Sequence, residues 1–102
     1  MYKSILLAHA KEDIREAAKW YSKQQKGLGK RFTEEVRNKI QLIKHNPKTA
    51  NVRYKNVRTA VLNTFPFMIH YTIDSINRTI IIYAVLHTSR STELWEGKSS
   101  EK

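Results

Sequence analysis

The 102-residue sequence contains no cysteine and only three glycines and two prolines. The absence of cysteine excludes disulfide bonds and thiolate metal sites, and it fits a reducing compartment. No segment approaches the roughly 20 apolar residues of a membrane-spanning helix, and the apolar part of residues 1–8 is shorter than a signal peptide needs. We therefore expect a single cytoplasmic domain with a modest core and no membrane partner.

Acidic residues are also scarce, because nine Asp and Glu face nineteen Lys and Arg, which gives a net charge of +10. A charge of this size favours polyanions or acidic proteins as partners. The first fifty residues carry +7 and the remainder +3, so the excess lies mostly on segments that we expect to be helical. A solvated basic surface and a binding footprint are equal alternatives at this point.

The motifs of several common enzyme classes are missing. The pair Gly27 and Gly29 lacks the third glycine of a dinucleotide-binding loop, and no G-x-S-x-G motif is present. The four histidines are widely spaced, and only His70 and His87 can meet on one strand face, with no carboxylate beside them in the sequence. We expect neither a metal site nor a cofactor.

The longest apolar stretch, residues 79–87 (TIIIYAVLH), is β-branched and aromatic and contains no charge or glycine. Such a stretch predicts a strand near the middle of a sheet, buried on both faces. Alternating patterns predict further strands over residues 2–7, 57–62 and 65–73, with Pro66 at the start of the last of these.

Two segments between the first and second predicted strands have helical periodicity. The first helix begins near His9 or Ala10 and carries Glu12 and Asp13 in its first turn, where carboxylates suit the helix dipole. A glycine turn at residues 27–29 leads to the second helix, so the two form an antiparallel hairpin. Their apolar stripes consist of Ala10, Ile14, Ala17, Ala18 and Tyr21, and of Leu28, Phe32, Val36, Ile40 and Ile43.

This order of elements predicts an α+β fold, β-α-α-β-β-β, in which the helical hairpin packs on one face of a small, mostly antiparallel sheet. The domain is expected to span residues 1–96, and residues 97–102 are expected to form a disordered tail.

Two loop lengths decide which side chains face the helices. We expect residues 74–77 to loop out so that Ile73 pairs with Arg78, and residues 63–65 to form a three-residue hairpin loop; a slip of one residue reverses the faces. The face away from the helices then mixes apolar side chains with two histidines and an arginine, which indicates a binding surface. The helix side contains Phe67, Ile69, Tyr71, Ile80, Ile82, Ala84 and Leu86, and the far side contains Arg58, Met68, His70, Ile81, Tyr83, Val85 and His87.

One reaction is compatible with these residues, namely the cleavage of RNA through its own 2′-hydroxyl. It needs a base, an acid and cations around the phosphate, and histidine and arginine supply such groups. The candidate set is Arg58, His70, His87 and Arg90. In the alternative interpretation, the histidines are half-buried sheet residues and Arg58 pairs with a carboxylate.

In their order and spacing, several segments resemble the RelE/ParE superfamily of toxins from bacterial type II toxin–antitoxin pairs, and the ParE branch in particular. The resemblance covers residues 2–95. It rests on residues 17–21 (AAKWY), 27–32 (GLGKRF), 57–58 (VR), 65–71 (FPFMIHY) and 87–90 (HTSR), and on Trp95.

The resemblance implies a small cytosolic toxin. The RelE branch cleaves messenger RNA in the ribosome, whereas the ParE branch poisons DNA gyrase and lacks the nuclease residues. Arg53, Lys55 and Arg58 are spaced more closely than the basic residues of the RelE pattern, and no tyrosine follows Tyr83. The resemblance therefore favours a non-enzymatic, ParE-like inhibitor; the alternatives are a RelE-like ribosome-dependent mRNA endoribonuclease and a degenerate member that only binds its partner.

The resemblance also implies a cognate antitoxin that wraps an extended or helical segment around the toxin, and through which oligomers can form. Such segments are often acidic, which the charge of +10 would favour. The residues expected to contact the target or the antitoxin are Arg58, Met68, Tyr83, His87, Arg90 and Trp95.

Overall fold

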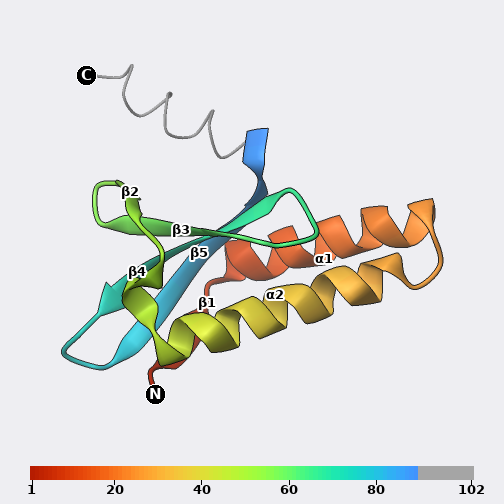
Figure 1. Ribbon diagram of the computed structural model, residues 1–102. Helices are drawn as coiled ribbons and strands as arrows, with labels where there is room; N and C mark the ends of the chain where they lie inside the picture. Colours follow the sequence, from red (N-terminus) through yellow and green to blue (C-terminus); the bar gives the residue numbers. More distant parts are fainter. Residues whose placement is uncertain (90–102) are drawn as a thin grey trace.

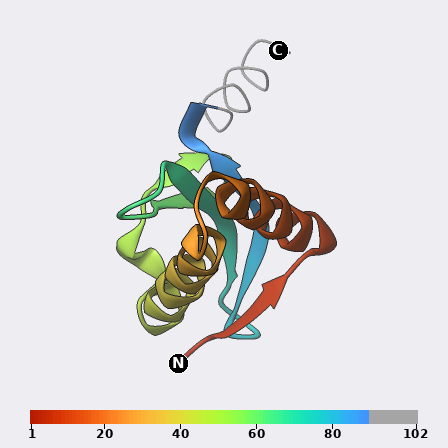
Figure 2. The same cartoon turned by 90° about the vertical axis from the view of Figure 1, so that its right-hand side faces the viewer.

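Two antiparallel helices pack on one face of a five-stranded sheet (Figure 1). The structure, a computed structural model, describes residues 1–89. Figure 2 shows both helices lying over the same side of the sheet, so the α+β prediction is confirmed. The elements are β1 (Lys3–Leu6), α1 (Ala8–Gln24), α2 (Leu28–His45), the 3-10 turn η1 (Pro47–Thr49), β2 (Val52–Tyr54), β3 (Val57–Val61), β4 (Phe67–Asp74) and β5 (Thr79–His87).

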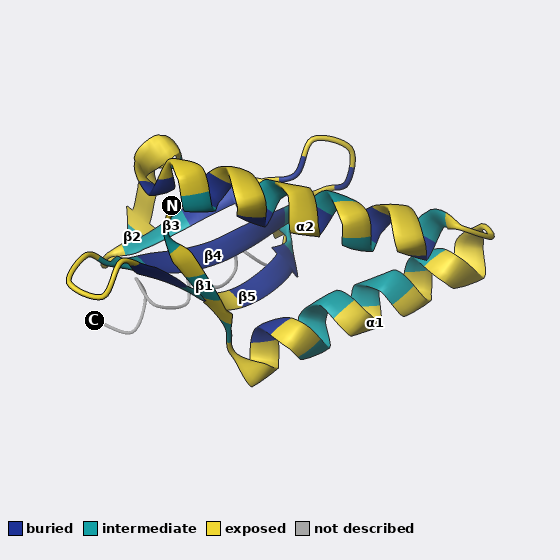
Figure 3. Ribbon diagram, turned by 90° about the horizontal axis from the view of Figure 1, so that it is seen from below, coloured by how far each residue is buried: buried dark blue, intermediate teal, exposed yellow. Residues whose placement is uncertain are grey.

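The strands lie in the order β1-β5-β4-β3-β2, with β1 parallel to β5 and every other neighbouring pair antiparallel. Strands β4 and β5 are mostly buried (Figure 3), so the prediction of a central strand over residues 79–87 is confirmed. The sheet has one strand more than predicted, because residues 52–54 form the short strand β2. Three residues are too few to show a periodicity of their own.

The helical hairpin is tight because glycine allows the two helices to approach. Gly27 precedes α2 with a φ of 84°, in the left-handed region that glycine adopts without strain. A Cβ atom at Gly29 would overlap the backbone oxygen of Ala18 and the side chain of Ser22. The predicted stripe of α2 is largely confirmed, since four of its five members are buried: Phe32, Val36, Ile40 and Ile43.

Helix α1 begins at Ala8, slightly earlier than predicted, so Glu12 and Asp13 do not lie in its first turn. The prediction that these carboxylates stabilise the first turn is therefore wrong. Instead, Glu12 pairs with Arg15 on the helix surface. Asp13 turns toward the sheet, where its Oδ2 atom accepts a hydrogen bond of 3.0 Å from the backbone N–H of Val85.

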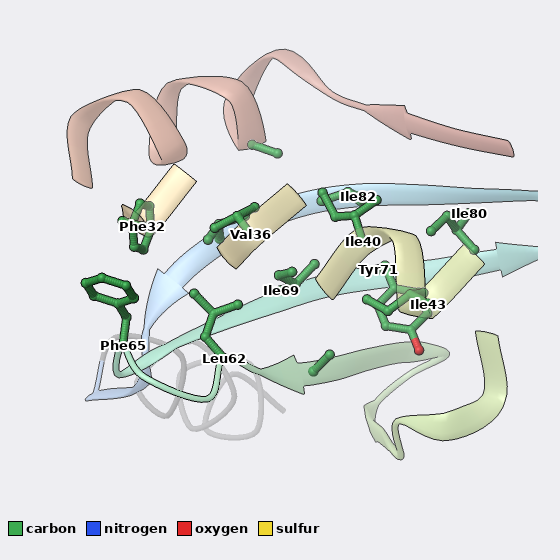
Figure 4. Packing of buried hydrophobic residues seen from close by; sticks show 13 residues of the cluster. Phe32, Val36, Ile40, Ile43, Leu62, Phe65, Ile69, Tyr71, Ile80 and Ile82 are labelled. Atoms are coloured by element: carbon green, nitrogen blue, oxygen red, sulfur yellow. The ribbon is translucent and has the colours of Figure 1, made fainter. Parts of the chain in front are cut away.

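The core lies between the helices and the sheet (Figure 4). The rings of Phe32 and Phe65 meet edge to face, with centroids 5.2 Å apart, and Ile69 is fully buried between the layers. The hydroxyl of the fully buried Tyr71 donates a 2.6 Å hydrogen bond to the carbonyl of Pro47. This bond fixes η1 against β4, at the end of α2.

The turn between β4 and β5 differs from the prediction without changing the faces next to it. Ile73 pairs with Ile80 and not with Arg78. Because the difference is two residues, the alternation of side chains is preserved. Ile80 and Ile82 therefore face the helices, as predicted.

A bulge at Tyr83 changes the faces of the second half of β5. It inserts one residue relative to β4, and an inserted residue reverses the alternation beyond it. Val85 and His87 consequently pair with the helix-facing residues of β4, whereas Ala84 and Leu86 point the other way. The faces predicted for these four residues are wrong.

The loop between β3 and β4 contains four residues, 63–66, since the N–H of Leu62 donates to the carbonyl of Phe67. The prediction of a three-residue loop is therefore wrong by one residue. As a result Arg58 pairs with Tyr71 and lies on the helix side of the sheet, not on the far side as predicted.

Neither of the two helices in residues 1–89 combines the length and apolar character needed to cross a bilayer.

Candidate functional site

Two members of the candidate ribonuclease set, Arg58 and His87, lie on the same face of the sheet but at opposite ends. Arg58 is half-buried, and its guanidinium donates a 2.6 Å hydrogen bond to the carbonyl of Ala50. Arg58 pairs with Tyr71, whereas His87 pairs with Phe67, four residues away along β4. This spacing corresponds to roughly 13 Å of strand, so the two side chains do not converge on one phosphate.

The third member, His70, is fully buried on the far face of the sheet. Its Nδ1 atom lies 3.0 Å from the hydroxyl of Tyr54. Burial lowers the pKa of His70 from 6.5 to about 4, because the charged form is disfavoured away from water. His70 is therefore neutral near pH 7 and enclosed. Arg90 and Trp95 lie outside the described residues.

The far face next to β2 is covered by side chains from β2 itself. The Nε atom of Arg53 donates to the hydroxyl of Thr59 at 3.2 Å, and the Tyr54 ring lies over His70 with centroids 5.9 Å apart. Thr59, His70 and Thr72 are all buried. The expectation of an open, binding-competent far face is thus wrong for this part of the sheet.

The remaining predicted contact residues differ in their exposure. Met68 is buried on the far face, whereas Tyr83, at the bulge, is 42% exposed. The Tyr83 hydroxyl accepts a long hydrogen bond of 3.4 Å from Thr72. His87 is half-buried, and its Nδ1 atom accepts a 3.2 Å hydrogen bond from the N–H of Ser89. Tyr83, at the bulge within β5, and His87, at the end of the strand, are therefore accessible to a partner.

An apolar hollow of about 400 Å³ lies between α1 and the end of β5. Trp20, which is 57% exposed, forms one wall, and His87 forms the other. The His87 ring packs edge to face on Phe67, with centroids 5.4 Å apart. The Trp20 ring also packs edge to face on Tyr21, with centroids 5.1 Å apart, so it contacts the α1 stripe and shapes this hollow.

A charge pattern that the count over the two halves of the chain does not reveal lies between Glu35 and Asp74. Between Glu35 and Asp74 the chain contains seven Lys and Arg residues and no carboxylate. Dividing the chain into halves conceals this stretch, which a sliding count of charge would have revealed. The seven residues lie on the second half of α2, η1 and the β2–β3 hairpin: Arg37, Lys39, Lys44, Lys48, Arg53, Lys55 and Arg58. Of these, Arg37 faces the groove between α1 and α2.

Within this basic region, a groove of about 300 Å³ runs around the outer edge of β3. Lys39 and Leu42 of α2 line one side, Arg53 and Thr59 line the other, and Val61 lies at the edge itself. We call this hollow the β3-edge groove. Leu42 is 61% and Val61 45% exposed, so cations and exposed aliphatic side chains share one surface.

The carboxylates near the loops are occupied by local hydrogen bonds. Burial opposes the charged form of Glu35, but hydrogen bonds from Thr64 and Asn63 lower its pKa overall; the bond from the Thr64 N–H is 2.7 Å long. Hydrogen bonds from Asn77 lower the pKa of Asp74. Among residues 1–89, no group of three or more acidic or histidine side chains is arranged to hold a metal ion.

Comparison with known families identifies the following match. A family model described as the ParE toxin of the type II toxin–antitoxin system parDE matches residues 5–92. A search of curated proteins finds no match.

Solved structures with a similar fold include components of both RelBE and ParDE systems. A chain of the intact E. coli RelBE toxin–antitoxin complex is 13% identical, with a TM-score of 0.66 over 84% of this chain and 95% of that one. A chain of the chromosomal ParDE system of P. aeruginosa is 16% identical, with a TM-score of 0.63 over 85% and 96%. A chain of the RelBE2 toxin–antitoxin complex of Mycobacterium tuberculosis is 13% identical, with a TM-score of 0.61 over 84% of this chain and 96% of that one. At these identities the likeness shows the fold alone.

Proposed function

The chain belongs to the ParE toxin family of type II toxin–antitoxin systems, and on this premise we propose that it is a cytoplasmic toxin that arrests growth by binding an essential protein target such as DNA gyrase. The observation that carries the non-enzymatic mode is the separation of the candidate catalytic side chains. Arg58 and His87 lie at opposite ends of one face, and His70 is enclosed on the other.

The physical argument concerns convergence. In-line attack by a 2′-hydroxyl requires its base within hydrogen-bond reach, roughly 3 Å, and an acid and cations around the same phosphate. His70 cannot supply a proton near pH 7, since burial lowers its pKa to about 4. Arg58 is engaged with the carbonyl of Ala50. Inhibition by binding needs no such convergence, and a basic, partly apolar surface suits it.

A RelE-like ribosome-dependent endoribonuclease is the second candidate. The observation that favours it is the basic stretch without carboxylates between Glu35 and Asp74, because a surface of this kind attracts the phosphates of RNA. In this reading His87 at the exposed end of β5 would act as the acid or base.

Two assays after induced expression distinguish these candidates. The proposal expects growth arrest, inhibition of supercoiling by purified gyrase, and no cleavage of ribosome-bound messenger. Cleavage that is lost in His87→Gln but retained in His45→Gln, which alters an exposed histidine at the end of α2, would replace the proposal by the second candidate. Absence of growth arrest would favour a degenerate member that only binds its partner.

The proposed partner is a cognate antitoxin with an acidic segment. Its support is the net charge of +10 and the family membership of the chain, since opposite charge accelerates and orients association. Co-expression with the products of the adjacent small genes tests this proposal. Growth arrest relieved by a co-purifying neighbour would support it, and failure of every neighbour to co-purify would count against it.

A further inference from the structure

The outer edge of β3 is only partly occupied by β2. The two strands pair through Val52 with Arg58 and through Tyr54 with Val57. One further bond, 3.3 Å long, runs from the N–H of Thr59 to the carbonyl of Asn51. Before Asn51 the chain leaves the sheet and enters η1. In residues 1–89, no strand continues along this edge beyond that bond.

The backbone at Val61 points into the space that β2 leaves. Successive backbone groups of a strand point to alternate sides. The N–H of Leu62 points toward β4, where it donates to Phe67, so the N–H and carbonyl of Val61 point outward, in the same direction as those of Thr59. An exposed strand edge of this kind is a template for pairing with another extended chain.

The surroundings of this edge select the chemistry of the segment that can add to it. Lys39 and Arg53 lie on opposite sides of the β3-edge groove, which no carboxylate lines, and Leu42 and Val61 expose aliphatic surface there. Alternate side chains of an added strand would point toward α2 and toward Arg53. Cations on both sides favour carboxylates, and exposed aliphatic groups favour apolar side chains between them.

From this geometry we infer that the β3-edge groove binds an extended, acidic segment of a partner protein, which adds as a short strand beside Val61, beyond the bond between Thr59 and Asn51. The inference rests on the proposed function, since it names where the acidic partner segment docks and how. A nucleic acid backbone fits less well, because the exposed Leu42 and Val61 offer phosphates no hydrogen bond.

The probe for the first test is a capped twelve-residue peptide of alternating Val and Glu, labelled with a fluorophore and titrated with the full-length chain. The expected result is saturable binding that weakens at least about tenfold in Lys39→Glu and in Arg53→Glu. Arg37→Glu makes the same charge change in the α1–α2 groove and should bind within about twofold of wild type. Equal losses in all three variants, or equal binding of a Val–Lys peptide, would overturn the inference.

The strand-addition mode has its own readout. Val61→Pro removes the outward N–H, which an edge strand tolerates, and should weaken binding at least about fivefold, whereas Val61→Thr retains the N–H and should bind nearly as wild type. If Val61→Pro fails to fold, amide hydrogen exchange in the wild type decides instead. Peptide should slow exchange at Val61 at least about tenfold, and unchanged exchange at saturation would exclude strand addition.

Two further arms separate this inference from its alternatives. The first uses a twelve-nucleotide single-stranded RNA. If this RNA binds more tightly than the Val–Glu peptide, and if Lys39→Glu and Arg53→Glu abolish its binding, the groove is a nucleic-acid site. In cells, Lys39→Glu should still arrest growth but should resist relief by the co-expressed partner. If the co-expressed partner relieves the arrest caused by Lys39→Glu as fully as that caused by the wild type, the β3-edge groove is not the docking site and the proposed function stands. If the wild type does not arrest growth, the proposed function fails.

Discussion

The sheet has two partly unpaired strand edges, one on β5 beyond the end of β1 and one on β3 beyond the pairing with β2, and their surroundings differ. Strand β1 ends opposite Ile82, so in the described residues the second half of β5 has a neighbouring strand, β4, on one side only. There, however, α1 lies alongside β5 (Figure 3), and Asp13 accepts a hydrogen bond from the N–H of Val85. At the other edge, cations and aliphatic side chains line the β3-edge groove and no carboxylate does. The nearby Glu35, which attracts Lys39, belongs to the adjoining hollow.

The difference shows how one chain can close one edge and leave another open to a partner. A carboxylate from the same chain satisfies the outward N–H of Val85 and places negative charge where a carboxylate-rich strand would have to dock. Charged groups at an edge are a common protection against unwanted pairing. The edge of β3 carries charge of the opposite sign, which repels basic segments and attracts acidic ones. The predictions below test the two sides of the sheet on which these edges lie, the β2 side and the β5 side.

The largest effect is expected from acidification, which acts through His70 beneath the β2 side chains. Burial lowers the pKa of His70 from 6.5 to about 4, so between these pH values the unfolded chain binds a proton that the folded chain excludes. Stability is therefore lost as the pH falls from about 6.5 to about 4, by up to about 3 kcal/mol. Urea unfolding measured across this range tests the prediction.

The control for this prediction is His70→Gln, which lacks the titrating group. Glu35 and Asp74, whose pKa values are lowered by hydrogen bonds, lose stabilisation on acidification in both proteins, so the difference between the two curves isolates His70. Parallel curves for wild type and variant would contradict the prediction.

Removal of the carboxylate at the β5 edge should have an intermediate effect. In Asp13→Ala the N–H of Val85 loses its partner, and a lost hydrogen bond to a charged group costs about 2 kcal/mol. Chemical unfolding should show this loss, and the Val85 amide should exchange faster with solvent. Glu16→Ala, an exposed change one turn along α1, should stay within about 0.5 kcal/mol. A slowly exchanging Val85 amide in Asp13→Ala would show that Asp13 does not close this edge.

The smallest effects are expected at the two hairpin tips. Lys55, between β2 and β3, and Arg78, before β5, both have positive φ values, 50° and 49°. Glycine relieves the left-handed strain but costs unfolded-state entropy, so Lys55→Gly should stabilise the fold by about 0.5 kcal/mol. Arg78→Gly should be close to neutral, since it also removes the guanidinium 4.6 Å from the Tyr2 ring centroid. Thermal unfolding that ranks the two variants in the reverse order would refute this prediction.

The regular elements could be predicted from the sequence because their periodicity is local. The stripe of Phe32, Val36, Ile40 and Ile43 repeats every three or four residues whatever lies opposite it, and the fold buries it as predicted. The same holds for residues 79–87, whose continuous apolar character predicted a central strand. Helix–sheet packing follows from such stripes, since each must bury its apolar side.

The composition of each sheet face could not be predicted in the same way. The four-residue loop before Phe67 moved Arg58 to the helix side, and the bulge at Tyr83 moved His87 there as well. Each change is the insertion of a single residue, and the alternation of apolar and polar side chains along a strand does not show where such an insertion occurs. The prediction of the site was therefore more sensitive to error than the prediction of the fold. An error of one residue moves a side chain to the other face and so removes it from the site, but the strand itself is still predicted.

By itself, the sequence determined the α+β class, the helical hairpin, the central strand and the basic charge, because periodicity, turn residues and charge are properties of neighbouring positions. Only the tertiary structure decided that His70 is enclosed, that Asp13 closes the edge of β5, and that Lys39 and Arg53 flank the edge of β3. The physical reason is that loop lengths and bulges set strand register, and register brings together residues that the sequence holds far apart.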